Sequence, residues 1–218
     1  MSRNRDLRSQ SRSEQGFTAR EVGNRNPIPT FLIVCEGAKT EPNYFRSFPV
    51  STRPEVTIVG AGCETIAVVN RAIELMENKK FDRVWCVFVR EASLQENRDP
   101  SNVNNTAARF RKALQVAEKE NIKVAYSNEC FEIWYLLHFH LYDTGIPRGD
   151  YKKKLTKLLG CDYAKNSDDM YARLEDIQHQ AIKHAKILLS SYDPHNLESD
   201  NPVTTVHLLV AELNQYIR

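Results

Sequence analysis

The chain has 218 residues, of which 41% are hydrophobic and 27% are charged. This length suits one domain, or one domain with an appended helical part, and the composition excludes the disordered, collagen-like and coiled-coil classes. Lys and Arg total 30 against 28 Asp and Glu, a formal net charge of +2. The net charge is therefore too small to indicate an acidic partner, and any surface that binds nucleic acid must be a local group of basic residues.

No segment predicts membrane insertion or secretion. The apolar runs are much shorter than the roughly 20 residues that a membrane-spanning helix needs. The opening MSRNRDLRSQSRSEQG carries charges but lacks the apolar stretch of a secretory signal. The five cysteines are widely spaced without a CxxC pair, which argues against a disulfide framework and against a zinc site. We therefore expect a cytoplasmic protein without a membrane partner.

Residues 1–27 differ in composition from the rest of the chain. They hold six arginines and almost no apolar residues, so burial cannot offset the entropy that ordering would cost. We predict a flexible basic N-terminal arm. It is either a plain tail or a segment that lies along the phosphate backbone of a nucleic acid.

From residue 28 onward, strand patterns alternate with helix patterns. Between the strand patterns, Thr40-Glu41-Pro42 marks the start of a predicted helix over 40–48, and apolar residues at helical spacing predict helices over 66–76 and 103–117. Short apolar runs predict buried strands at residues 31–35, 55–60, 83–89 and 122–126. This alternation predicts an α/β domain over residues 28–127, with a parallel sheet of about four strands flanked by helices.

After residue 127 the sequence contains no further strand of comparable quality. The apolar positions instead predict four helices, at residues 130–141, 150–159, 174–188 and 206–217. We therefore expect a helical C-terminal subdomain over residues 128–218.

One short motif stands where chemistry is expected in such a fold. The segment CEGAKTE, residues 35–41, follows the first predicted strand, and ligands of parallel α/β sheets gather at the carboxyl ends of the strands. Glu36, with Gly37 beside it, would suit Mg²⁺ or Mn²⁺, which prefer hard oxygen ligands. The same residues also fit a plain acidic loop, with Glu41 in the first helical turn favoured by the helix dipole. Motifs of P-loop hydrolases, α/β hydrolases and HExxH metalloproteases are absent from the sequence.

Three segments, in the same order, resemble the motifs of the RloB-like family, also known as the AbiLii abortive-infection proteins. They are LIVCEGAKTEPNYF (32–45), SNECFEIWYLLHF (127–139) and NPVTTVHLLV (201–210), and the resemblance extends over residues 27–218. It implies a Toprim-like fold with a glutamate after the first strand and an Asp-x-Asp pair after the third. Together these carboxylates would bind Mg²⁺ or Mn²⁺ for phosphodiester cleavage. The family also implies an ABC- or SMC-like ATPase partner in prokaryotic anti-phage defence.

Glu36 matches the glutamate of that pattern, but the third strand departs from it. The chain reads Phe88-Val89-Arg90-Glu91, so Glu91 stands in for the second aspartate and Val89 has no oxygen to donate. Two functions stay open. The chain is either a metal-dependent nuclease acting on RNA or DNA, with Glu36 and Glu91 as catalytic and metal-binding residues, or an inactive Toprim module. Such a module would bind nucleic acid or dock on the ATPase. The oligomeric state is open too, a homo-oligomer included.

Five further residues are candidate substrate contacts. Lys39 and Arg46 flank the end of the first strand and could meet phosphate. Lys153 and Lys157 belong to the most basic stretch of the chain, which is either a solvated helix face or a phosphate-binding surface. Glu132 lies in an apolar segment, so it is either buried with a hydrogen-bond partner or acts at the sheet edge as an acid, base or substrate contact.

Overall fold

The computed structural model describes residues 29–49, 55–58, 65–90, 106–196 and 199–217. The predicted N-terminal arm (residues 1–27) and the candidate metal ligand Glu91 lie outside the described residues, and both remain predictions.

A five-stranded sheet with the order β2-β1-β3-β4-β5 forms the middle layer of the fold. Four strands are parallel: β1 (Phe31–Cys35), β2 (Glu55–Ile58), β3 (Arg83–Arg90) and β4 (Lys123–Asn128). This confirms the expected α/β class and the parallel part of the sheet. A fifth strand, β5 (Val203–Thr204), runs antiparallel to β4 and was not expected. Two residues are too few to carry a strand pattern.

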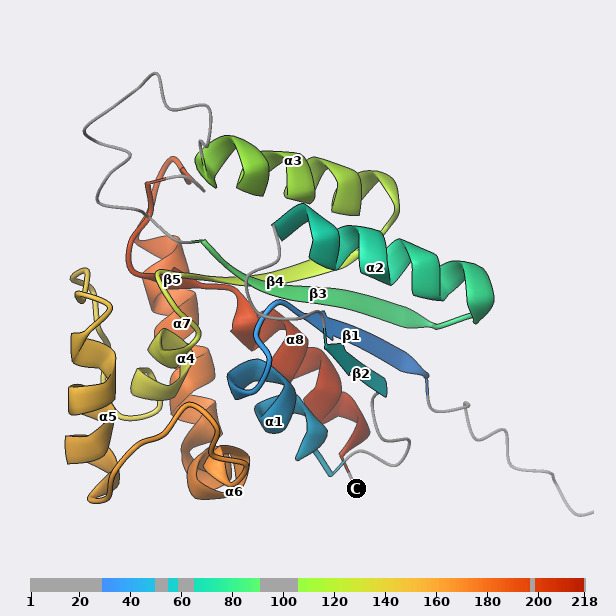
Figure 1. Ribbon diagram of the computed structural model, residues 1–218. Helices are drawn as coiled ribbons and strands as arrows, with labels where there is room; N and C mark the ends of the chain where they lie inside the picture. Colours follow the sequence, from blue (N-terminus) through green and yellow to red (C-terminus); the bar gives the residue numbers. More distant parts are fainter. Residues whose placement is uncertain (1–28, 50–54, 59–64, 91–105, 197–198, 218) are drawn as a thin grey trace, which may run out of the picture.

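The central strands β1 and β3 carry continuous apolar runs because helices cover both faces of the sheet (Figure 1). Along β1, Leu32 and Val34 point into one hydrophobic core, whereas Phe31, Ile33 and Cys35 point into another. This alternation follows from the two-residue period of a strand. A strand buried on both faces has no polar face, so it reads as a continuous apolar run.

The two cores are built by different sets of helices (Figure 1). On one face, α2 (Thr65–Asn78) and α3 (Thr106–Lys119) pack against the sheet. On the other face the core includes α1 (Thr40–Arg46) together with the C-terminal helices. These are α4 (Glu132–Leu136), α5 (Asp150–Leu159), α6 (Met170–Leu174), α7 (Gln178–Ser190) and α8 (Val206–Leu213). The C-terminal part is thus helical, as expected, while the domain boundary at residue 127 stays a prediction.

Three of the predicted helices are shorter or more broken than their apolar spacing indicates. The helix expected over 130–141 reduces to α4, and the chain continues in a tight turn to residue 140. The helix expected over 174–188 is divided into α6 and α7 by a 3₁₀ segment at Glu175–Ile177, and α8 ends in another at Asn214–Tyr216. Apolar spacing reports which residues face the core, but 3₁₀ turns keep nearly the same spacing.

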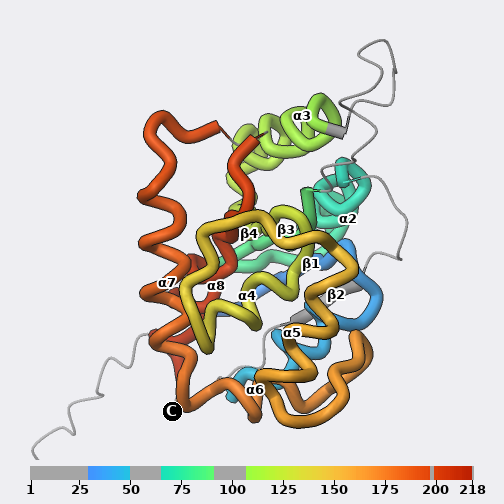
Figure 2. The backbone as a smooth tube through the Cα atoms, turned by 90° about the vertical axis from the view of Figure 1, so that its left-hand side faces the viewer, coloured from blue at the N-terminus to red at the C-terminus, as the bar shows by residue number. Residues whose placement is uncertain are grey.

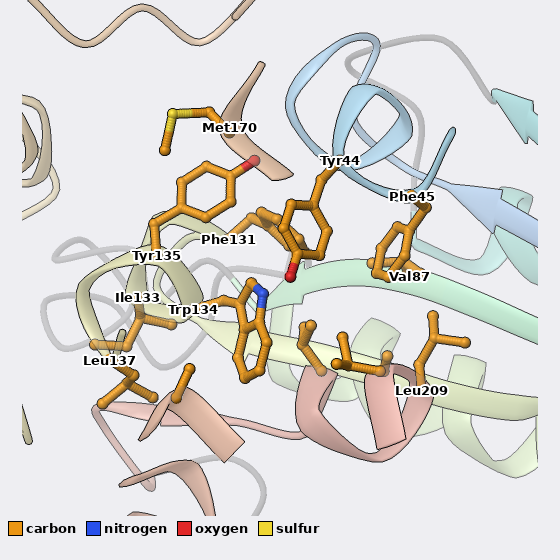
Figure 3. Close-up of a cluster of buried hydrophobic side chains, with 14 of the residues drawn as sticks. Tyr44, Phe45, Val87, Phe131, Ile133, Trp134, Tyr135, Leu137, Met170 and Leu209 are labelled. Atoms are coloured by element: carbon orange, nitrogen blue, oxygen red, sulfur yellow. The ribbon is translucent and has the colours of Figure 1, made fainter. Parts of the chain in front are cut away.

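Aromatic side chains fasten α1 to the C-terminal helices (Figure 3). The fully buried ring of Tyr44 contacts the rings of Phe131, Trp134 and Tyr135, with centroids 5.6–6.4 Å apart. Its hydroxyl accepts a hydrogen bond from Nε2 of Gln178 on α7. Aromatic pairs of this kind stabilise a core beyond their buried area. The helix that follows Glu36 is therefore held in place at one end of the sheet.

None of the helices in the described ranges is both long and apolar enough to cross a membrane.

Candidate functional site at the carboxyl edge of the sheet

Glu36 connects the ends of the two central strands. Its backbone N–H donates to the carbonyl of Val87 at 2.9 Å, which continues the β1–β3 ladder by one residue. Its carboxylate then accepts a hydrogen bond from the backbone N–H of Val89 at 2.8 Å. The other carboxylate oxygen lies 3.4 Å from Oγ1 of Thr65, at the start of α2. The Glu36 carboxylate therefore lies at the carboxyl end of β3, where the family pattern has its Asp-x-Asp pair.

Glu41 brings a second carboxyl group back to the same loop. It lies in the first turn of α1 and is only 5% exposed. Its carboxyl group packs against Gly37, so closely that a Cβ atom at position 37 would overlap it. A glycine is needed here because it lets the loop backbone pass directly over the carboxyl group.

The environment of Glu41 favours its neutral form. Burial is the main cause and outweighs a backbone hydrogen bond that lowers the pKa, while the charges of Glu132 and Glu36 add to the rise, so the pKa of Glu41 goes from 4.5 to about 7. Lys165 opposes this effect only weakly, as the smallest of the named contributions. A carboxyl group with a pKa near 7 can hold or release a proton at neutral pH.

Glu132 is the third carboxylate of this region. It is 3% exposed and lies in the first turn of α4. One of its oxygens, Oε1, accepts a hydrogen bond from the hydroxyl of Tyr163 at 3.2 Å and lies 3.5 Å from Nζ of Lys165. Glu132 thus has the hydrogen-bond partner that burial requires. His138 does not pair with it, since its Nδ1 bonds to the carbonyl of Trp134.

A loop between α5 and α6 carries these partners of Glu132 and is fastened to α1. The hydroxyl of Thr40 donates to the carbonyl of Lys165 at 3.0 Å, and Nδ2 of Asn43 lies 3.2 Å from the carbonyls of Asn166 and Ser167. Figure 2 looks onto the carboxyl ends of β1, β3 and β4, and α4 and α5 lie at this end of the sheet. The C-terminal helices therefore flank the edge that holds Glu36.

The predicted phosphate contacts occupy different parts of this surface. Lys39 is exposed and directly precedes α1 in the loop after Glu36. Arg46 is exposed in the last turn of α1, about 10 Å further along the helix axis. Lys153 and Lys157 are exposed on α5, and their four-residue separation places them on the same helix face. Their roles as substrate contacts stay predictions.

The third strand ends without a side-chain ligand at position 89. Val89 is half-buried and offers only its backbone N–H, which Glu36 already accepts. In the described ranges, no three His, Cys, Asp or Glu side chains stand close enough together to hold a metal ion. Glu91 lies outside the described residues, so the metal-binding role of Glu36 and Glu91 stays a prediction.

Sequence reasoning missed three functional candidates at this edge. From the sequence, Glu41 is expected in an acidic loop and the first turn of a helix, whereas in the structure it is buried beside Glu36. Tyr163 and Lys165 reach Glu132 from a loop about 30 residues further along the chain. The Gly37 that separates Glu36 from Glu41 is the one signal for Glu41, because a glycine next to a strand end often marks a close approach.

The sequence profile of the RloB-like protein family matches residues 31–213, which is most of the chain. The chain belongs to the RloB-like family. The expectation from the three motifs is therefore confirmed at the level of the family. None of the curated proteins and none of the solved structures that we compared matches the chain.

Proposed function

We propose that this RloB-like protein is a Toprim-type, metal-dependent nuclease that cleaves phosphodiester bonds in RNA or DNA. In this proposal it is the effector of a prokaryotic anti-phage or abortive-infection system and acts with an ABC- or SMC-like ATPase. The observation that carries the proposal is the position of Glu36. Its carboxylate lies at the carboxyl ends of the two central parallel strands and accepts the N–H of Val89.

The side chains at this edge fit a magnesium or manganese ion. Mg²⁺ commonly uses one or two carboxylates and completes its shell with water and substrate phosphate oxygens. Glu36 is half-buried and supplies one carboxylate, while the raised pKa of Glu41 reports a second carboxyl group in the same acidic surroundings. Glu36, with Glu91 and Glu41, would hold the ion. When bound, the ion would stabilise negative charge on the phosphate and lower the pKa of a coordinated water.

The residues of the chain have separate tasks in this proposal. Glu36 would ligate the ion and Glu91 would assist, with a water molecule as the nucleophile. The lysines at positions 39, 153 and 157 are exposed and attract the phosphates of the nucleic-acid strand on either side. Lys165 neutralises part of the charge of Glu132, so the edge does not repel a polyanion as strongly as three free carboxylates would.

The first experiment measures Mn²⁺ binding and cleavage in the same proteins. Wild type should bind Mn²⁺ saturably and cleave a single-stranded RNA or DNA, and Glu36→Ala should lose both properties. Glu74→Ala is a matched control, because Glu74 is an exposed glutamate on α2 that pairs with Arg71. Unaltered Mn²⁺ binding by Glu36→Ala would refute the enzyme proposal.

A second function is favoured by position 89. Because Val89 has no oxygen to donate, the chain could serve as a binding module that docks on the ATPase or on nucleic acid without cleaving it. Val89→Asp separates the two proposals. If only this variant cleaves, the native chain is a binding module. If wild type also cleaves, the carboxylates already present suffice.

The partner and substrate are tested in cells. Co-expression with an ABC- or SMC-like ATPase, followed by sequencing of cellular RNA and DNA ends, should reveal cuts that depend on Glu36. Cuts in one class of nucleic acid only would identify the substrate.

A further inference from the structure

Two aromatic rings and a lysine meet where the chain passes from α4 to α5. The ring centroids of His140 and Tyr142 are 6.3 Å apart, and the two ring planes are inclined at 69° to each other. Nζ of Lys154, on α5, lies over the ring of Tyr142 at 5.6 Å from its centroid. His140 is exposed, while Tyr142 and Lys154 are half-buried. We call these three residues the Tyr142 surface.

The ring of Tyr142 is held in place by the protein core. Tyr142 packs against the hydrophobic core that α1 and the C-terminal helices form. Ile146, four residues later, is buried and anchors the same segment. A surface that is already fixed loses little conformational freedom when a ligand binds. The ring is therefore positioned to receive a flat ligand on the part that solvent reaches.

Contacts connect this segment to the end of β4. A Cβ atom on Gly145 would lie 3.6 Å from Nδ2 of Asn201, and the same Nδ2 donates to Oε1 of Glu129 at 3.3 Å, directly after β4. The residue before Asn201 is Asp200, whose carbonyl accepts a hydrogen bond from Nδ2 of Asn128 at 2.7 Å. Figures 1 and 2 show the segment on the side of the molecule toward which the parallel strands run. The Tyr142 surface thus lies on the side of the carboxyl edge, next to β4.

Two further lysines continue the surface along α5. Lys157 is three residues after Lys154 and four after Lys153, so the three side chains lie next to one another on the helix. Lys153 and Lys157 are exposed. Asp150, in the first turn of α5, lies on the same side of the helix and offsets one of the three charges. The side of α5 that borders Tyr142 therefore stays basic.

A comparison with Lys123 shows what is specific to Lys154. Nζ of Lys123 also lies over an aromatic ring, 5.3 Å from the centroid of Trp85, but it is 2.9 Å from a carboxylate oxygen of Glu212. Its charge is therefore already neutralised. None of the salt bridges among the described residues includes Lys154. The Lys154 ammonium is thus available to an anion from outside.

An aromatic ring beside several ammonium groups matches the chemistry of a single nucleic-acid strand. Proteins that bind single strands stack unpaired bases on aromatic side chains and track the phosphates with basic ones. In a duplex, each base is covered on both faces by its neighbours and cannot reach such a ring without unstacking. A ring with adjacent lysines therefore favours single strands over duplexes, whereas lysines alone would not distinguish the two.

We propose that the Tyr142 surface binds an unpaired base of a single-stranded nucleic acid, while the lysines of α5 contact the flanking phosphates. This inference rests on the proposed function and specifies the single-stranded form of its substrate. The base takes the place of the Lys154 ammonium over the ring of Tyr142, and the inclined ring of His140 borders it on one side. The displaced ammonium, on its flexible four-carbon stem, then reaches a phosphate next to that base.

The test measures binding of a labelled oligonucleotide by fluorescence anisotropy, without divalent cations so that cleavage cannot consume it. Wild type should bind the single strand more tightly than the same sequence annealed to its complement. Tyr142→Leu should weaken binding of the single strand about 5- to 150-fold, the range for losing one stacked base. Tyr142→Phe keeps the ring and should match wild type. Equal affinity for single strand and duplex, or unchanged affinity in Tyr142→Leu, would overturn the inference.

Tyr216→Leu is the matched control. Tyr216 is also half-buried, but its ring contacts Phe31 at the start of β1, which is the opposite edge of the sheet. Its substitution should leave the affinity for the single strand unchanged. Equal losses in Tyr142→Leu and Tyr216→Leu would contradict a specific role of Tyr142.

An abasic oligonucleotide separates stacking from a structural effect of the substitution. It keeps the phosphates but lacks the bases, so wild type and Tyr142→Leu should bind it equally. A loss that persists with this probe would show that Tyr142→Leu disturbs the structure, and stacking would be refuted. Lys154→Gln should weaken binding of both probes and reduce the slope of log affinity against log salt by about 0.7, the value for one phosphate of a single strand. An unchanged slope would remove Lys154 from the surface.

The outcomes separate this inference from the proposed function. If cleavage depends on Glu36 but Tyr142→Leu binds the single strand like wild type, the inference alone fails. If wild type binds single strands through Tyr142 but cleaves neither RNA nor DNA, the nuclease proposal fails and the inference stands for a binding module. If wild type binds no oligonucleotide, the inference is overturned, whereas Mn²⁺ binding by Glu36 still tests the metal site.

Discussion

The carboxyl group of Glu41 occupies the space that a Cβ atom on Gly37 would need. Because Glu41 is buried, its carboxyl group has little room to move aside. We expect Gly37→Ala to lower the free energy of unfolding by about 1–3 kcal/mol, the usual cost of overpacking. Chemical denaturation measures this change.

The control for that substitution is Gly149→Ala. Nothing lies within 4 Å of a Cβ atom at Gly149, and its φ of −68° suits alanine. Its free energy of unfolding should stay within about 0.5 kcal/mol of wild type. The double variant Gly37→Ala/Glu41→Ala should recover part of the loss, because the overlapping group is gone. Equal losses in the two glycine variants would contradict the close approach.

The raised pKa of Glu41 predicts a pH-dependent stability. With a pKa of about 7 in the folded protein and 4.5 ordinarily, the folded state binds more protons between these values, so stability falls as pH rises through this window. The shift corresponds to at most about 3 kcal/mol. Glu41→Gln cannot ionise, so its advantage over wild type should grow from near zero at about pH 4 to its maximum above about pH 7.

Denaturation curves of both proteins at several pH values measure this effect. Parallel stability profiles of wild type and Glu41→Gln would show that folding does not raise the pKa of Glu41.

The two partners of Glu132 should differ in their contribution to stability. Tyr163 is buried, and Tyr163→Phe removes a hydrogen bond to a buried carboxylate, so we expect a loss of about 1–3 kcal/mol. The Lys165 side chain is 63% exposed and 3.5 Å from Glu132, so Lys165→Met should cost less than about 1 kcal/mol. Urea denaturation at low and high salt measures both losses of stability. A larger loss in Lys165→Met than in Tyr163→Phe would contradict this prediction.

The exposed lysines of α5 should govern the salt dependence of nucleic-acid binding. Each of Lys153→Gln and Lys157→Gln should reduce the slope of log affinity against log salt by about 1, if each lysine contacts a phosphate. Lys112→Gln is the matched control, because Lys112 is exposed on α3, which covers the opposite face of the sheet. Fluorescence anisotropy with a labelled oligonucleotide measures the slopes. Identical slopes in all three variants would remove α5 from the binding surface.

The sequence predicts those parts of the fold that depend on burial along a single segment. The runs at 31–35 and 83–89 are apolar because both faces of β1 and β3 are covered, and the structure confirms them as strands. The short β5 could not be predicted, since its position depends on pairing with β4 about 75 residues earlier.

In the candidate site, too, only the features that depend on a single segment could be predicted from the sequence. Glu36 follows directly from its place after the first strand, because strand ends of a parallel sheet share one edge. The burial of Glu41 depends on how the chain turns at Gly37, and the contact of Glu132 with Tyr163 depends on the loop between α5 and α6. Segment-by-segment reasoning contains no information on such contacts between distant segments.

The late position of β5 in the chain has a consequence for synthesis on the ribosome. Ser127 and Asn128 pair with β3 on one side, and on the other side their strand partners are Thr204 and Val203. A nascent chain can pair β1 to β4 much earlier, but the edge that carries Asp200 closes only after residue 204 has left the ribosome. The outer side of the end of β4 thus stays unpaired in the nascent chain until residues 203 and 204 are available, whereas the contact of Glu36 with Val89 needs only β1 and β3.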